Sequence, residues 1–286
     1  MNEEHWSATA EGAAIMRALH QSLDDDPKIL VDPIAPRLIE PDGEFYKGAL
    51  AGFERLPPQL KARYRSLFVM RSRYAEDCLA ESFSNGVRQY VILGAGLDTF
   101  AYRQPLWARP LRVFEVDHPA TQQWKRRRLA AAGIAIPGNV SLVAVDFESV
   151  TLTRGLSGAP LDFTAPTLFA LLGVSQYLTQ ASLDLTLRFV LSMPASSEIV
   201  LSFVLPESAR PPDEAALVAA SSARSAEMGE PWLTAFLPDE LVAKLRAMGF
   251  SRVAHLSPDA ATQRYFRERS DGLSVWRNEQ LVRATV

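Results

Sequence analysis

The sequence is poor in the residues that build disulfides, metal centres and nucleophilic hydrolase sites. Its 286 residues include one cysteine, Cys78, and four histidines. A single cysteine excludes an internal disulfide, and neither a C-x-x-C nor an H-E-x-x-H spacing occurs, so we predict no metal site. No G-x-S-x-G motif occurs either, which leaves a hydrolase nucleophile elbow unsupported. We therefore interpret Cys78 as a helix residue rather than a nucleophile.

Basic charge and long apolar runs are also scarce. Lys and Arg number 30 against 33 Asp and Glu, whereas nucleic-acid binders usually carry a basic excess. We interpret the basic run at 125–128 as the solvated face of a helix. No window approaches 18 uncharged apolar residues, and the polar N-terminus lacks the apolar core of a signal peptide. We therefore expect a cytoplasmic protein with neither a nucleic-acid nor a membrane partner.

The hydrophobic pattern divides the chain into a helical first part and an alternating second part. Residues 1–84 have mostly helical spacing, and Pro57-Pro58 opens a long helix, because proline suits a first helical turn. Beyond them, apolar runs without internal alternation, such as 90–93, are typical of strands covered on both faces. Strands that alternate with helices predict an α/β fold with a doubly wound, mostly parallel sheet.

We expect a helical N-terminal cap at 1–84 and a second domain at 85–286 that carries an inserted lid at 206–236. The expected strands of the parallel part are 88–93, 111–116, 139–145, 167–172 and 197–204. The helices expected between and after them are 99–107, 119–132, 180–192 and, in the lid, 213–228. The last expected elements are a helix at 238–247, a strand at 250–256, a helix at 259–267 and a strand at 272–277, with the two strands pairing antiparallel.

The most specific motif is QYVILGAGLDTFAYR at Gln89–Arg103, followed by LRVFEVDH at Leu111–His118. A strand, the turn Gly94-Ala95-Gly96, a helix and an acid-tipped second strand suit a nucleoside, because glycines admit the backbone and a carboxylate holds ribose hydroxyls. Thr99 replaces the third glycine of a dinucleotide fingerprint, which argues against NAD or FAD. We favour S-adenosylmethionine, a nucleoside without phosphates; the alternative is a plain tight turn in a βαβ unit.

Charged residues near strand ends and on the long helix are candidates for the other cofactor contacts. Asp117, at the end of the second strand, can accept hydrogen bonds from both ribose hydroxyls. Asp146 can accept from the adenine amino group while Phe147 covers the ring. Arg71 or Arg73 can pair with the cofactor carboxylate, bidentately if well placed. The plainer alternatives are that Asp146 only ends a strand and that both arginines lie on a solvated face.

Four further candidates have two interpretations each. Asp98 is either a ligand contact or the N-cap of a helix that starts at Thr99. Glu115 either touches the ligand or supports the glycine turn. His118, the nearest candidate for a general base, lies either by the methyl group or, as we favour, by the ribose. Tyr177, which follows the fourth strand together with Ser175 and Gln176, either orients an acceptor oxygen as a catalytic residue or is a core tyrosine with a wet hydroxyl.

These residues carry a resemblance to a known family. The chain resembles the leucine carboxyl methyltransferase family, in its broad bacterial branch of proposed S-adenosylmethionine-dependent O-methyltransferases. The matching pieces occur in family order over nearly the whole chain, and the LGAGLDT and FEVD pair is the most specific of them. They are Asp32–Ala35, Arg71–Asp77, Leu93–Thr99, Phe114–Asp117, Val145–Phe147, Gly173–Leu178, Gly229–Trp232 and Arg264–Phe266.

The resemblance implies a class I methyltransferase (Rossmann-like) fold with a helical cap and S-adenosylmethionine as cofactor. In family terms, Arg71 would contact the methionyl carboxylate and Gly94 the methionyl part. Asp117 would contact the ribose, and Asp146 with Phe147 would contact the adenine. Arg17 is a looser match from the N-terminal segment.

Two positions depart from the family pattern. Phe100 stands where many members have Arg after the LDT motif. Leu172 stands where many members carry a Glu before glycine, and that Glu contacts the cofactor in the protein-modifying members. We keep Leu172 as a candidate at this contact position. The missing Glu favours a small-molecule acceptor over the phosphatase-modifying activity.

We therefore expect an S-adenosylmethionine-dependent O-methyltransferase that acts on a carboxylate or a phenolic hydroxyl of a small molecule, with secondary metabolism as one setting. A carboxylate is ionised at neutral pH and needs no general base, which mildly favours it. The rivals are a nicotinamide-dependent oxidoreductase on a similar sheet and a non-catalytic cofactor-binding relative. The sequence does not identify the acceptor or the oligomeric state.

Overall fold

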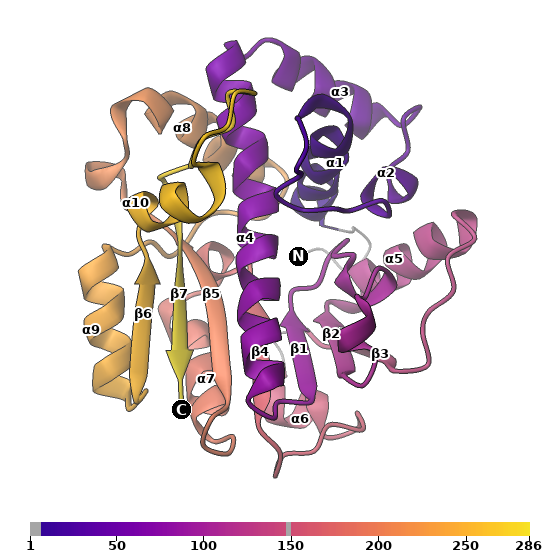
Figure 1. The fold of residues 1–286 in the computed structure, drawn as a ribbon, viewed down its shortest axis with the longest axis vertical. Coiled ribbons are helices and arrows are strands. Elements are labelled where there is room, and N and C mark those ends of the chain that lie inside the picture. The colour runs from indigo at the N-terminus through magenta and orange to yellow at the C-terminus, as the bar shows by residue number, and fades with distance from the viewer. Residues whose placement is uncertain (1–6, 147–149) are drawn as a thin grey trace.

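The computed structural model describes residues 7–146 and 150–286 (Figure 1). Its seven described strands form one sheet in the order β3-β2-β1-β4-β5-β7-β6. All pairs from β3 to β5 are parallel, whereas β7 runs antiparallel between β5 and β6. The strands are β1 Gln89–Leu93, β2 Arg112–Asp117, β3 Val140–Ala144, β4 Thr167–Leu171, β5 Glu198–Val204, β6 Arg252–Leu256 and β7 Glu279–Thr285. The predicted α/β fold with a mostly parallel sheet is confirmed.

Helices cover both faces of this sheet, with α4 in front and α7 behind in Figure 1. Strand β1 explains the arrangement, because its side chains alternate between two apolar clusters. Tyr90 and Ile92 pack in the cluster of α4, while Val91 and Leu93 pack in the cluster of α7. The helices are α1 Ala8–Leu23, α2 Ala35–Leu38, α3 Glu44–Glu54, α4 Pro58–Ser84, α5 Pro119–Ala131, α6 Leu152–Leu156, α7 Gln180–Leu191, α8 Pro212–Glu227, α9 Pro238–Met248 and α10 Pro258–Ala261.

Helices α1, α2, α3 and α8 lie beyond the carboxyl ends of the parallel strands, together with the first half of α4 (Figure 1). A separate apolar cluster joins α1, α3, α4 and α8, and it includes Met16, Phe53, Phe68, Val218 and Trp276. This cluster brings the first 70 residues against α8, which follows β5, and against Trp276, which precedes β7. In parallel sheets, ligands bind at this carboxyl edge. The helices therefore roof the edge where a ligand is expected.

Three predicted elements differ in the structure. The helix predicted at 99–107 is instead two 3₁₀ turns, Phe100–Tyr102 and Leu106–Ala108, because Pro105 lies between them and has no N–H to continue a helix. The last strand, predicted at 272–277, lies at Glu279–Thr285, where it pairs with both β5 and β6. The helix predicted at 259–267 is α10 followed by the π turn Thr262–Phe266.

The basic run at 125–128 on α5 is not the solvated face that we predicted. Lys125 is buried with its Nζ 2.7 Å from a Glu115 carboxylate oxygen, and Arg128 is buried with its Nη2 3.1 Å from Glu11. Partners are needed because an unpaired buried charge is strongly destabilising. Only the two middle residues of the run, Arg126 and Arg127, are exposed. No helix of the described ranges is long and apolar enough to cross a bilayer.

Candidate functional site

A cavity of about 760 Å³ lies between the carboxyl edge of the sheet and the helices that roof it. This volume falls within the range typical of small-molecule sites. Ten of the thirteen predicted site residues line it, namely Arg71, Gly94, Ala95, Gly96, Asp98, Asp117, His118, Asp146, Leu172 and Tyr177. Arg73 and Glu115 are absent from its lining, and Phe147 lies outside the described residues. The structure thus gathers most of the predicted residues around one cavity.

The glycine turn after β1 needs glycine at both of its ends. Gly94 and Gly96 have φ values of 68° and 44°, in the left-handed region that side chains disfavour. A Cβ atom on Gly94 would also collide with Val174, and one on Gly96 would lie 2.8 Å from the Cβ of Ala10 in α1. The turn therefore fits tightly between α1 and the segment after β4, with its backbone open to the cavity.

Asp117 ends β2 and holds the glycine turn in place. Its carboxylate accepts a hydrogen bond from the Gly96 N–H at 2.5 Å and another from the His118 N–H at 2.7 Å. Burial raises the pKa of Asp117, although both backbone donors oppose that shift. A carboxylate has lone pairs for further donors. Its position beside the turn is suited to the two hydroxyls of a ribose.

Glu115 lies two residues earlier on β2 and is absent from the cavity lining. It is fully buried, and its carboxylate accepts a hydrogen bond at 2.8 Å from the Tyr102 hydroxyl in addition to the pairing with Lys125. Burial raises the pKa of Glu115, and Lys125 opposes the shift. The described contacts of the Glu115 carboxylate are thus with Tyr102 and Lys125, and no hydrogen bond between described residues joins it to the glycine turn. Asp98 lines the cavity and accepts a hydrogen bond from the Phe100 N–H at 2.8 Å, but the helix that it was expected to cap is replaced by a 3₁₀ turn that starts at Phe100.

Arg71 and Arg73 lie two positions apart on α4 and point in different directions. The Nη1 of Arg71 lies 3.1 Å from a carboxylate oxygen of Glu279, at the start of β7. Its guanidinium packs over the Phe68 ring and against Gly173, where a Cβ atom would collide with it. The Arg73 side chain is 46% exposed and pairs with Asp77 at 2.7 Å. Of the two, Arg71 is therefore the arginine that can meet a ligand.

A buried ionic network joins the N-terminal segment to the glycine motif. Asp32 accepts a hydrogen bond from the Arg17 Nε at 3.2 Å and another from the Thr99 hydroxyl at 2.7 Å. Arg17 also donates to the carbonyl of Leu97 at 2.5 Å. Burial alone would raise the pKa of Asp32, but Arg17 and Arg103 lower it. Thr99, which replaces the third fingerprint glycine, therefore anchors the motif to the cap.

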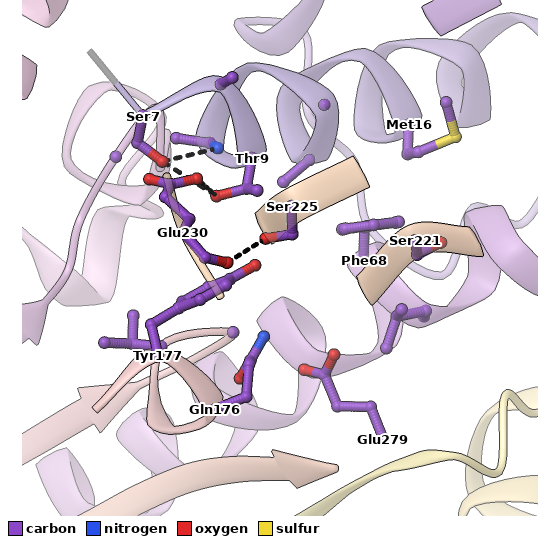
Figure 2. Close-up of a pocket in the computed structure, with 18 of the residues that line it drawn as sticks. Ser7, Thr9, Met16, Phe68, Gln176, Tyr177, Ser221, Ser225, Glu230 and Glu279 are labelled. Carbon is purple, nitrogen blue, oxygen red and sulfur yellow. Dashed lines mark hydrogen bonds between the residues drawn. The ribbon is translucent and has the colours of Figure 1, made fainter. Parts of the chain in front are cut away.

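Tyr177 also lines the cavity, and it lies in a 3₁₀ turn after β4. Figure 2 shows Tyr177, Gln176 and Glu279 on one side of the cavity, opposite Thr9 and Ser225. Burial raises the pKa of the Tyr177 hydroxyl, and the side chains of Ser225 and Thr9 oppose the shift. Such a hydroxyl stays protonated near neutral pH. It can donate a hydrogen bond to an acceptor molecule.

Contacts with Glu230 tie α1 and the end of α8 together above Tyr177. The Thr9 hydroxyl donates to the Glu230 carboxylate at 2.8 Å, and the Ser225 hydroxyl donates to the Glu230 carbonyl at 2.5 Å (Figure 2). Sequence reasoning missed Thr9, Ser225 and Glu279 as cavity residues. Gln176 was expected at the ligand edge from its place after the fourth strand. No local pattern marks the other three, because tertiary packing alone brings them together.

The described residues include no group of three or more His, Cys, Asp or Glu side chains that could hold a metal ion. The chemistry available around the cavity is therefore that of carboxylates, amides, hydroxyls and the guanidinium groups of Arg17, Arg55, Arg71 and Arg224. Carboxylate and backbone groups gather at the glycine turn. Aromatic, amide and hydroxyl groups gather around Tyr177. The cavity thus offers two chemically different sets of groups.

Comparison with known proteins identifies the family. The sequence profile of the leucine carboxyl methyltransferase family matches residues 10–191. A Bacillus subtilis (strain 168) relative, named "Putative S-adenosyl-L-methionine-dependent methyltransferase YktD", is 36% identical over 75% of this chain and 70% of its own length. A Mycobacterium sp. (strain JLS) protein of the same description, without the name YktD, is 31% identical over 70% of this chain and 68% of its own length.

Solved structures show the same fold. A structure of a proposed methyltransferase from Thermobifida fusca superimposes with a TM-score of 0.60 at 15% identity, over 96% of this chain and 93% of the other. A DUF574 family protein from Streptomyces avermitilis gives a TM-score of 0.58 at 19% identity, over 96% of each chain. The chain has the class I, Rossmann-like methyltransferase fold, and it belongs to the leucine carboxyl methyltransferase family.

Proposed function

We propose that this S-adenosylmethionine-dependent methyltransferase acts on an oxygen atom of a small-molecule acceptor. One observation carries the proposal: a single cavity contains both the glycine turn with its acid-tipped strands and a separate aromatic space around Tyr177. A methyl transferase needs donor and acceptor in contact, because alignment is its main catalytic contribution. The acceptor class stays open here between a carboxylate and a phenolic hydroxyl.

The residues at the glycine turn fit an S-adenosyl group. Asp117 takes the ribose hydroxyls, with His118 beside it, and the backbone of Gly94, Ala95 and Gly96 admits the methionyl part. Asp146 lines the cavity after β3 and is assigned to the adenine. Leu172 and Asp98 complete the walls of this end. When bound, S-adenosylmethionine supplies the electrophilic methyl group.

Arg71 is assigned to the methionyl carboxylate, since it is the cationic side chain beside Gly173 at the carboxyl end of β4. Tyr177 is assigned to the acceptor oxygen, which its protonated hydroxyl can orient. The segment 206–236 and the N-terminal helices act as a lid that excludes water, and the hydrogen bonds of Glu230 support that role. The division into a cap at 1–84 and a domain at 85–286 stays a prediction, as does a setting in secondary metabolism.

Binding of S-adenosylhomocysteine, followed by calorimetry, tests this assignment. We expect the wild type to bind it and Asp117→Ala to bind it about 10- to 100-fold more weakly, because hydrogen bonds to a charged group contribute about 1.5–3 kcal/mol. Asp146→Ala tests the adenine contact in the same way. NADPH serves as the control ligand and is expected not to bind. Equal binding by wild type and Asp117→Ala, or no binding by either, would contradict the assignment.

A further inference from the structure

The space around Tyr177 forms a distinct end of the cavity, which we name the acceptor chamber. Its floor consists of Gln176, Tyr177 and Glu279, which project into the cavity in Figure 2. Its walls come from α3, α4, the segment after α8 and the segment before β7, and they are Phe45, Phe53, Tyr64, Phe68, Trp232 and Trp276. Aromatic side chains prefer offset-stacked or edge-to-face contact with other rings. The walls therefore favour a flat aromatic molecule.

Two buried amide side chains facing the cavity have an oxygen that lacks a partner. Gln176 is 3% exposed and Asn278 is 1% exposed, and neither Oε1 of Gln176 nor Oδ1 of Asn278 has a hydrogen-bond partner within the described chain. The backbone carbonyl of Gln176, by contrast, already accepts hydrogen bonds from the N–H groups of Leu233 and Thr234. A buried acceptor without a partner is costly, so these oxygens mark places where a ligand can donate.

The charges of the chamber also favour a donor over an anion. Glu279 adds a buried carboxylate to the floor, and its partner is Arg71 at 3.1 Å. The other buried cation of the described lining, Arg17, is paired with Asp32. The remaining arginines of that lining, Arg55 and Arg224, are exposed. No unpaired buried cation of the described lining is therefore available to an acceptor carboxylate, which would also meet Glu279 as a like charge.

We propose that the acceptor is a neutral aromatic compound with a hydroxyl group, and that Glu279 receives that hydroxyl. This inference rests on the proposed function and narrows the acceptor from the two classes left open there. The ring lies against the aromatic walls while the hydroxyl donates to Glu279 and accepts from Tyr177. The side of the Arg71 guanidinium that faces away from Glu279 contacts the methionyl carboxylate. The Glu279 carboxylate can therefore still accept a hydrogen bond from the acceptor hydroxyl.

The reaction of a hydroxyl, unlike that of a carboxylate, releases a proton that needs a destination. The acceptor oxygen forms a bond to the methyl carbon while the carbon–sulfur bond breaks and its electron pair stays on sulfur. The hydroxyl proton passes to the Glu279 carboxylate and from there to solvent. A positioned base of this kind contributes typically about 100- to 10,000-fold to a rate. Glu279 is therefore assigned as a catalytic residue in addition to selecting the acceptor.

Binding of 2-naphthol and 2-naphthoate to protein saturated with S-adenosylhomocysteine tests the proposal. The two probes share a ring system and differ in the group presented to the floor. We expect 2-naphthol to bind at least about 10-fold more tightly, since a site built around a hydroxyl discriminates strongly against analogues that lack it. Glu279→Gln should bring the ratio of the two probe affinities toward one. It should not weaken the binding of S-adenosylhomocysteine, because Arg71 then has no Glu279 carboxylate that competes with the methionyl carboxylate. The exposed Glu207, outside the cavity lining, supplies the control Glu207→Gln, which should behave as the wild type.

Several outcomes would overturn the proposal. Tighter or equal binding of 2-naphthoate would do so, as would binding of neither probe to the saturated protein. If the wild type binds no S-adenosylhomocysteine, the proposed function fails together with this inference; if it binds that ligand but not 2-naphthol, only the inference fails. Gln176→Met provides a second variant if Glu279→Gln does not fold, because the backbone contacts of Gln176 do not need its side chain. It should weaken 2-naphthol about 3- to 10-fold, as expected for one lost hydrogen bond, and unchanged 2-naphthol affinity would count against the proposal.

Discussion

The two ends of the cavity are built in different ways. The end around the glycine turn takes its central residues from one continuous stretch, since Gly94, Gly96 and Asp117 belong to two consecutive strands and the turn after the first. The acceptor chamber takes its residues from segments spread over the chain, from Phe45 to Glu279. A local motif thus sets the first end, whereas packing of remote segments sets the second.

This difference indicates which end can change without loss of the other. The glycine turn is fixed by backbone geometry and by the carboxylate of Asp117, so a substitution there affects every ligand of the cofactor end. The chamber depends on side chains from several helices, so single substitutions can alter its chemistry while the turn stays intact. This arrangement is therefore compatible with one cofactor and different acceptors in proteins that share the fold.

The largest effect is expected at Asp32, where the N-terminal helices meet the glycine motif. Asp32→Ala leaves Arg17 and Arg103 buried without their shared carboxylate and removes the partner of the Thr99 hydroxyl. Breaking a buried ion pair from one side costs about 3–5 kcal/mol. We expect the free energy of unfolding in urea to fall by that amount. Asp42→Ala, at an exposed turn residue, is the control; an equal effect of both would show that the network does not hold the motif.

A smaller effect is expected at Gly94. An alanine there has an unfavourable φ of 68° and a Cβ atom that collides with Val174. Such strain costs about 1–3 kcal/mol, so we expect S-adenosylhomocysteine to bind about 10- to 100-fold more weakly. Gly138→Ala is the matched control, because nothing lies within 4 Å of its Cβ position and its φ is ordinary. Calorimetry on both variants decides, and unchanged affinity in Gly94→Ala would mean that the turn adapts.

The same contrast explains what the sequence could and could not predict. The strands from 88 to 204 were predictable because parallel strands covered on both faces are continuous apolar runs, as Tyr90–Leu93 shows. The turn at Gly94 was predictable because its chemistry is local. Glu279 was not, because the residue belongs to a strand whose start was predicted seven residues too early, and its partner Arg71 lies on α4.

Buried charges were the other weakness of sequence reasoning. Lys125 looks like a surface residue because it stands in a basic run, and only the fold places the Glu115 carboxylate beside it. By residue type and position alone, Arg71 and Arg73 have equal claims, and only the family resemblance singles out Arg71. Helix geometry separates them, because residues two apart face different sides of a helix. The residue type was therefore readable, but the direction of the side chain was not.

A comparison of two ligands separates the methionyl contact from the nucleoside contacts. Arg71→Ala should weaken S-adenosylhomocysteine about 10-fold, since a charge-assisted hydrogen bond contributes about 1.5–3 kcal/mol and the loss is partly offset by water. The affinity of Arg71→Ala for 5′-methylthioadenosine, which lacks the amino-acid part, should stay within about twofold of the wild-type value. Arg73→Ala should affect neither ligand, because its side chain is largely exposed and pairs with Asp77. Equal weakening of both ligands in Arg71→Ala would instead indicate general disruption of the cavity.

The smallest effect is expected where α1 meets the end of α8. Thr9→Val keeps the shape of the side chain and removes its hydrogen bond to Glu230, which contributes about 0.5–1.5 kcal/mol. If the roof opens to release the ligand, that loss should appear as an S-adenosylhomocysteine dissociation rate raised about 2- to 10-fold with an unchanged association rate. Stopped-flow fluorescence measures both rates, and the exposed Thr153→Val on α6 is the control. A fall in the association rate alone would mean that Thr9 shapes the open cavity rather than its closure, and that the acceptor chamber is assembled before the ligand arrives.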